Sequence, residues 1–138
     1  MSTEFSDMQD LITTKMHEDV DEVALKDAIN SAIDALWKKL CEFNPELYLA
    51  QQPDPLVLDA DIIPFEDLGP DDFIKFSAMA ELYDDIYEYD SAEKYGNKAE
   101  GELYSIMNLM LQKMERQDSI TPHTPREYTA GSVQWSED

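Results

Sequence analysis

The feature that most constrains the fold is an apolar stripe at helical spacing over residues 25–40. Apolar residues that recur at i, i+3, i+4 and i+7 occupy one face of a helix, and polar residues occupy the opposite face. Asn44 and Pro45 disfavour continuation of this helix, so it is predicted to end near Phe43. Because such a stripe must pack against other elements, the pattern predicts a mainly α-helical chain. The stripe consists of Leu25, Ala28, Ile29, Ala32, Ile33, Leu36, Trp37 and Leu40.

Three further patterns give about four predicted helices and a small helical bundle. A thin apolar stripe over residues 7–18 follows a predicted capping box from Ser6 to Gln9. A third helix is predicted from Gly69 to about residue 89, with Ile86 and Tyr87 in its stripe. The last is predicted from residue 90 to about residue 116, antiparallel to the third across a tight turn. Its apolar positions are Tyr95, Ala99, Leu103, Ile106, Met107, Met110 and Met114.

Two glycines interrupt this last predicted helix. Gly96 and Gly101 each cost about 1 kcal/mol of helix stability relative to alanine, so some compensating role is expected. One interpretation is close packing against a neighbouring helix. The other is a bend at a contact between subunits.

Residues 44–70 have a different composition from the helices. Five of the seven prolines lie there, and residues 54–72 contain seven acids and no base. This composition predicts a long, partly extended middle loop, of the length that usually carries function or is mobile. Residues 56–58 and 62–63 are expected to form two short extended pieces, with Asp59, Ala60 and Asp61 in the turn between them.

Helical periodicity ends after Arg116, and residues 117–138 contain two prolines, a glycine and several hydroxyl side chains. We therefore predict a helical domain over residues 1–116, with a loop insertion at 44–70, and an extended C-terminal arm over 117–138. Isolated apolar and aromatic residues in such an arm are typical anchors for a binding partner. The candidate partner-binding residues are Ile120, Tyr128, Val133 and Trp135.

The net charge is −21, from 31 acidic and 10 basic residues. Such a chain repels phosphate, which disfavours direct nucleic-acid binding. Two classes of acidic protein remain: those that present a negative surface to which DNA does not stick, and those that imitate DNA to capture basic proteins. Cys41 is the single cysteine, so an internal disulfide and a multi-cysteine zinc site are excluded.

No concentrated set of catalytic or metal-binding residues is found in the sequence. His17 and His123 are the only histidines, and neither has a second strong ligand at a metal-site spacing. Nucleotide-binding, nucleophile-elbow and zinc-protease motifs are missing. Neither an apolar run long enough for a membrane span nor a signal-peptide pattern occurs. We expect a non-enzymatic protein without cofactors, in the cytoplasm or in a particle assembled there.

The order of these parts resembles the helical head-tail connector (adaptor) proteins of tailed bacteriophages. The resemblance lies in residues 24–37 (ALKDAINSAIDALW), in the acidic segment that ends at residues 62–65 (IIPF), and in residues 78–83 (AMAELY), which lead into residues 92–110. It covers roughly residues 20–115 and rests on apolar patterns. The chain departs from the family in its weak strand signals and its strong acidity.

The resemblance implies a ring of about twelve copies beneath the portal protein of the virion, assembled in the host cytoplasm. A closed ring requires two different faces of each copy to meet. The C-terminal arm would dock on the portal or on a neighbouring copy, and double-stranded DNA would pass through the channel without specific binding. The acidic residues implied to line the channel or to face the next tail component are Asp54, Asp59, Asp61, Glu66 and Asp67. The alternative is an acidic DNA mimic or inhibitor that binds a basic host protein.

Overall fold

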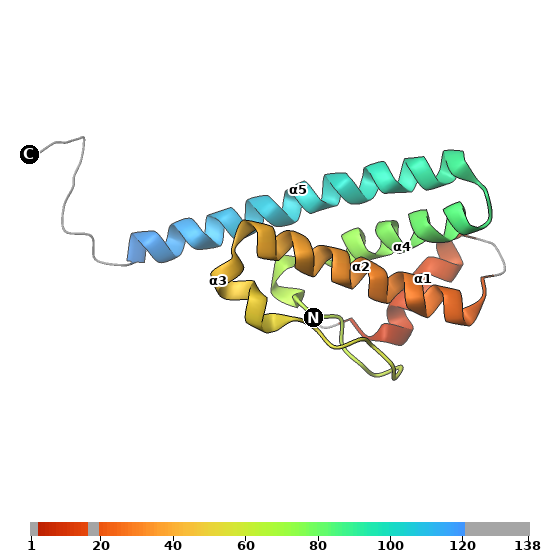
Figure 1. Cartoon of the computed structure of the whole chain (residues 1–138), viewed down its shortest axis with the longest axis horizontal. Helices are drawn as coiled ribbons and strands as arrows, with labels where there is room; N and C mark the ends of the chain where they lie inside the picture. The colour runs from red at the N-terminus through yellow and green to blue at the C-terminus, as the bar shows by residue number, and fades with distance from the viewer. Residues whose placement is uncertain (1–2, 17–19, 121–138) are drawn as a thin grey trace, which may run out of the picture. The chain divides into compact units, whose positions relative to one another are not determined.

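The computed structural model describes residues 3–16 and 20–120, and for residues 115–120 only the backbone. This part of the chain is mainly helical and contains no β-strand, which confirms the predicted class (Figure 1). Contacts divide the chain into two compact units, residues 1–107 and 108–138. The helices are α1 (Phe5–Met16), α2 (Glu22–Phe43), α3 (Pro45–Tyr48), α4 (Asp71–Asp85) and α5 (Tyr89–Ile120), with 3-10 helices η1 (Leu49–Gln51) and η2 (Glu66–Leu68).

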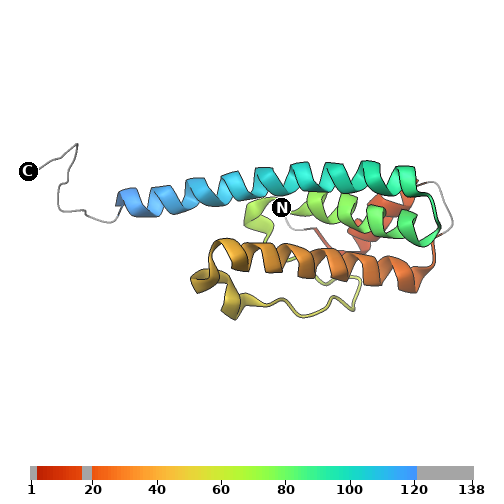
Figure 2. The ribbon, with the colours of Figure 1, turned by 45° about the horizontal axis from the view of Figure 1, so that its top comes forward.

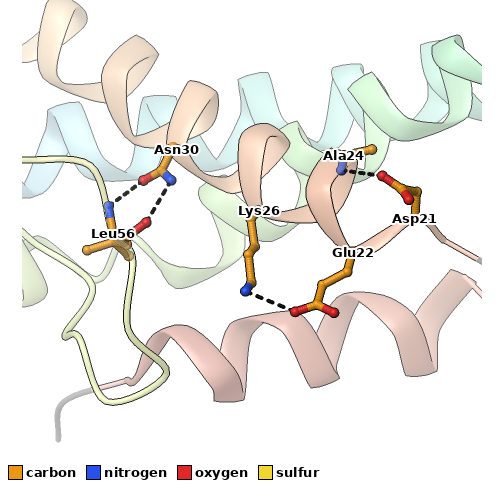
Figure 3. Close-up of polar contacts among 6 residues, drawn as sticks. All are labelled: Asp21, Glu22, Ala24, Lys26, Asn30 and Leu56. Atoms are coloured by element: carbon orange, nitrogen blue, oxygen red, sulfur yellow. Dashed lines mark hydrogen bonds and ion pairs between the residues drawn. The ribbon is translucent and has the colours of Figure 1, made fainter.

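Helix α2 forms as its sequence pattern predicts. The Asp21 carboxylate accepts a hydrogen bond from the Ala24 N–H at 3.0 Å and caps the first turn (Figure 3). The helix ends at Phe43, and Pro45 occupies the first turn of α3. Within the unit formed by residues 1–107, α2 packs against α4, and α1 contacts both (Figures 1 and 2). The buried residues of α2 are Leu25, Ala28, Ile29, Ala32, Ile33, Leu36 and Leu40.

Trp37 is the one member of the predicted stripe that is only half-buried. Its indole N–H donates to the backbone carbonyl of Tyr48 at 2.8 Å. The side chain therefore ties the end of α2 to α3, the short helix that follows it. An aromatic residue with a polar edge suits such a position, because its ring packs while its N–H finds an acceptor.

The predicted capping box at the start of α1 is wrong. The helix begins at Phe5, and Ser6 lies inside its first turn. The N–H groups of Phe5 and Ser6 donate to the backbone carbonyls of Asp61 at 2.7 Å and Asp59 at 3.1 Å. In a capping box the Ser6 N–H would donate to the Gln9 side-chain oxygen, but here it donates to the Asp59 carbonyl instead. Backbone carbonyls far away in the sequence therefore satisfy these helix-start N–H groups. A local sequence pattern could not reveal such a contact.

Helices α4 and α5 contact each other through aromatic rings. Tyr95 stacks on Tyr83 with ring centres 5.5 Å apart and on Phe76 with ring centres 5.9 Å apart. Helix α4 ends at Asp85 instead of near residue 89, and a short turn leads into α5 (Figure 1). Ile86 and Tyr87, predicted to belong to the apolar stripe, are exposed on this turn.

The two glycines of α5 do not pack closely against a neighbouring helix. A Cβ atom added at Gly96 or Gly101 would meet no atom within 4 Å. The close-packing interpretation is therefore wrong for both residues, and the interpretation as a subunit contact stays a prediction. Helix α5 also continues past Arg116 to Ile120, so the first four residues of the predicted arm are helical.

Candidate interaction surface

Residues 52–63, here called the acidic loop, connect η1 to the segment before η2. The two extended pieces predicted in it do not form strands, because only an isolated bridge pairs Ile62 with Glu4. The turn predicted between them is confirmed, since the Asp61 N–H donates to the Leu58 carbonyl at 2.9 Å. The loop is thus held by individual hydrogen bonds in place of a sheet.

The first of these contacts comes from Asn30 on α2. Its side-chain oxygen accepts from the Leu56 N–H at 2.8 Å, and its side-chain nitrogen donates to the Leu56 carbonyl at 3.1 Å (Figure 3). One amide side chain therefore satisfies both backbone groups of Leu56, as a neighbouring strand would. This contact fixes the middle of the acidic loop against the polar face of α2.

The second contact lies inside the loop. One carboxylate oxygen of Asp61 accepts the N–H groups of Val57 and Leu58, both at 2.8 Å. These two donors lower the pKa of Asp61 below its ordinary value, because they stabilise the ionised form. The carboxylate of Asp61 therefore organises the loop's own backbone.

The third set of contacts joins the loop to the beginning of the described chain. In addition to the two bonds from the start of α1, the Ile63 N–H donates to the Thr3 carbonyl at 2.9 Å. The Thr3 hydroxyl donates in turn to the carboxylate of Asp71, in the first turn of α4. Residues 3–6 therefore bridge the acidic loop and α4.

The tip of this ordered loop is apolar and exposed. Val57 and Leu58 are 68% and 67% exposed, and Ile62 is also exposed. Large aliphatic side chains that an ordered loop holds in water are typical of surfaces that contact another protein. This tip could not be identified from the sequence, because the run of apolar residues fits a buried strand equally well.

The acidic residues predicted to act together lie in two different segments. Asp54 and Asp59 are exposed on the acidic loop, where Asp61 is turned towards its own backbone. Glu66 and Asp67 lie on η2. The charge of Asp67 reaches Tyr48, whose pKa is raised first by burial and then by this charge.

An open groove separates the start of the acidic loop from α2. Its volume is about 570 Å³, and Asp27 and Asp34 on α2 face Asp54 across it. Gln52, Pro53 and Pro55 complete the loop side. Carboxylates from both sides give the groove a negative potential, which suits a basic side chain and disfavours phosphate.

The predicted partner-binding residues fall largely beyond the described part of the chain. Tyr128, Val133 and Trp135 lie outside the described residues, as do His17 and His123. Ile120 is the last residue of α5, and only its backbone is described. Their assignment to partner binding stays a prediction.

Three further observations concern the described residues alone. Among them, no three His, Cys, Asp or Glu side chains gather in a way that could hold a metal ion. None of the helices there is long and apolar enough to cross a membrane. Cys41 is half-buried on α2.

Comparisons with protein families, with curated proteins and with solved structures found no match to this chain. A functional proposal therefore rests on the residues and geometry described above.

Proposed function

We propose that this chain is a non-enzymatic structural protein of a tailed bacteriophage, and that its copies form the head-tail connector ring beneath the portal. The observation that carries the proposal is the acidic loop, which combines exposed carboxylates with an exposed apolar tip and is ordered by its own contacts. In this proposal the ring extends the DNA channel and provides the site where the tail attaches.

The charge of the chain supports a channel role. A ring repeats the net charge of −21 in every copy, and the 54–72 segment contributes acids without any base. Repeated carboxylates repel the phosphate backbone, so DNA can slide past without being held. Asp54, Asp59, Glu66 and Asp67 are exposed and are the proposed channel or loop residues. Asp61 would act indirectly, by shaping the loop that carries the others.

The apolar tip supports a contact with the next tail component. Val57 and Leu58 need a protein surface to cover them, and the loop is already ordered by Asn30 and Asp61. A loop that is ordered before it binds loses less conformational entropy on binding. We therefore propose that the tip docks on the next tail component.

The remaining proposed contacts use α5 and the arm. Gly96 and Gly101 leave open space on α5, so the backbone of a neighbouring copy can approach there. The proposed architecture is a small helical bundle with an extended arm over residues 117–138. In the arm, Ile120, Tyr128, Val133 and Trp135 would dock on the portal or on a neighbouring copy.

Mass photometry of the purified chain, alone and mixed with portal rings from the same phage, tests this proposal. We expect ring-sized addition to the portal, and deletion of residues 121–138 should reduce that addition. Replacing Val57 and Leu58 by serine should leave portal binding intact but abolish recruitment of the next tail component. The matched control replaces Leu47 and Leu49, which are exposed on α3 and η1.

A different result would favour the alternative function. If the chain ignores the portal and forms a stoichiometric complex with a basic DNA-binding host protein, the connector proposal fails. The DNA-mimic reading then predicts that duplex DNA competes with the chain for that protein. Competition by duplex DNA is not expected for portal binding.

A further inference from the structure

Three large apolar side chains are exposed together where α4 turns into α5. Figures 1 and 2 show the course of the backbone at this turn. Ile86, Tyr87 and Tyr89 are 44%, 77% and 60% exposed. The two tyrosine rings meet edge to face, with centres 6.3 Å apart. Exposed aromatic residues that cluster in this way are enriched where proteins bind one another, because their rings give much contact area at small entropic cost.

Four carboxylates lie next to these rings in the sequence. Asp84, Asp85, Glu88 and Asp90 are all exposed, and no Lys or Arg lies between Lys75 and Lys94 in the sequence. In the part of the chain that the structure describes, lysines form ion pairs with Glu22, Asp34, Glu42 and Asp72. The cations recorded over aromatic rings lie over Phe76 and Tyr95. The turn therefore offers both carboxylates and exposed aromatic rings to a cation from another molecule.

Several residues of this turn are poor choices for the stability of the chain itself. Tyr87 has a φ of 64°, in a helix-ending motif where its N–H donates to Asp84 and the next N–H donates to Tyr83. Glycine normally occupies that position, because a side chain is strained there. Asp84 and Asp85 place negative charge at the end of α4, where the helix dipole disfavours it.

Phe65 provides the comparison inside the same chain. It also has a positive φ, of 62°, but its ring packs edge-on against Tyr48 with centres 6.0 Å apart. Packing within the fold accounts for the choice of residue at position 65. The ring of Tyr87 instead contacts Tyr89, which is itself exposed. Residues that break local rules without a packing gain tend to mark functional sites.

We infer that this turn surface, defined by Ile86, Tyr87 and Tyr89 with the four neighbouring carboxylates, binds an arginine-bearing segment of a partner protein. A guanidinium group is planar, so it stacks on an aromatic face and forms paired hydrogen bonds with a carboxylate at the same time. An ammonium group does not provide this combination. The inference goes beyond the connector proposal, and it holds whether or not the chain forms a ring.

The test uses a fluorescein-labelled peptide in which four arginines alternate with leucines, together with its lysine analogue. Fluorescence anisotropy with the full chain, in about 150 mM salt to screen long-range attraction, gives the Kd of each peptide. The arginine peptide should bind more tightly than the lysine peptide. Tyr87→Gly should raise its Kd about tenfold or more, as expected for loss of an interface anchor. The melting temperature should stay the same or rise, because glycine relieves the strained φ.

Two matched controls separate the turn surface from the general acidity of the chain. Tyr104 is 67% exposed on α5, about four helical turns away, and Tyr104→Ala should leave the Kd unchanged. Neutralising Asp84, Asp85, Glu88 and Asp90 to their amides should weaken binding more than neutralising Asp54, Asp59, Glu66 and Asp67.

The inference is overturned if the arginine peptide does not bind, or if the lysine analogue binds equally well. It is also overturned if both sets of neutralised acids weaken binding equally, because attraction to the net charge would then explain it. None of these measurements uses the portal, so their failure is distinguishable from failure of the connector proposal.

Discussion

At the scale of single residues, Asn30 makes the contact that most directly fixes the acidic loop. We predict that Asn30→Ala lowers the free energy of unfolding by about 1–2 kcal/mol, because two hydrogen bonds to Leu56 are lost. Hydrogen exchange at Leu56 should accelerate. Urea denaturation and exchange of the full chain measure both effects.

The control for this substitution is Asn97→Ala. Asn97 is exposed on α5, so the change in helix propensity is the same while no loop contact is removed. Its effect on unfolding should stay within about 0.5 kcal/mol. Equal effects of the two substitutions would show that Asn30 does not hold the loop.

Asp61 gives the acidic loop a pH dependence. Its pKa in the folded chain lies below the ordinary 3.8, because the N–H groups of Val57 and Leu58 stabilise the carboxylate. The stabilisation is therefore complete above pH 3.8 and is lost as the pH falls through the lowered pKa. We predict that the amide signals of Val57 and Leu58 shift together across that acid range in NMR titration.

Asp61→Asn is the matched variant, since it keeps an acceptor oxygen but does not titrate. In this variant the two amide signals should no longer follow a common acid transition. A titration that persists unchanged would assign the shift to another carboxylate. The sequence did not reveal this role, because Asp61 looks like any other acid in a segment rich in them.

At the scale of elements, the helices were predictable where one face meets a core and where a local signal ends the helix. Helix α2 has both, from its long stripe and from Pro45. The start of α1 was missed because carbonyls distant in sequence satisfy its N–H groups. The end of α4 was missed because Ile86 and Tyr87 continue the apolar spacing while lying exposed. Contacts from distant segments and exposed apolar residues are not encoded in local periodicity.

Substituting the glycines by alanine should change the free energy of unfolding in opposite directions in α5 and at the end of η2. Gly96→Ala and Gly101→Ala should each stabilise the isolated chain by about 0.5–1 kcal/mol, because alanine favours helix and its Cβ meets open space. Gly69→Ala should destabilise it by about 1 kcal/mol, since Gly69 has a φ of 62° at the end of η2. Thermal and urea unfolding measure all three variants.

These helix substitutions also bear on the proposed ring. If α5 forms a subunit contact at Gly96 or Gly101, the stabilised variants should assemble on portal rings less well than the unmodified chain. Destabilisation of the isolated chain by either alanine would instead mean that some neighbour fills the space beside α5.

At the scale of the whole molecule, electrostatic repulsion should limit stability. Four ion pairs among the described residues join side chains three or four positions apart on the same helix, each with at least one exposed partner, and such pairs contribute little. Burial and then the charges of Asp85 and Asp27 raise the pKa of Glu81, so ionised Glu81 opposes folding at neutral pH. Repulsion between carboxylates therefore reaches from α4 to α2.

We predict that added sodium chloride raises the melting temperature at neutral pH. Raising the ionic strength from about 0.01 M to about 0.15 M shortens the screening length from about 30 Å to about 8 Å and weakens repulsion among the acids. The control is the same titration near pH 4, where many carboxylates are protonated and the effect should shrink. A melting temperature that falls with salt would mean that the ion pairs outweigh the repulsion.

The candidate interaction surface was less predictable from the sequence than the fold. Composition predicts an acidic protein and apolar periodicity predicts a helical one, but Asn30, Asp61 and Tyr87 become notable only when their partners and exposure are known. Each of the three depends on a backbone geometry that the sequence pattern does not specify.

The hydrogen bonds from Phe5 and Ser6 link the start of α1 to the acidic loop. If the loop tip docks on a partner as proposed, a partner that holds Val57 and Leu58 would also hold the loop carbonyls to which the first turn of α1 donates. Linkage between two sites is reciprocal. A substitution that destabilises the start of α1 should therefore weaken the affinity of that partner, and binding of the partner should stabilise the start of α1 by the same factor. Residues at the start of α1 would thus affect affinity at the loop tip without touching the partner.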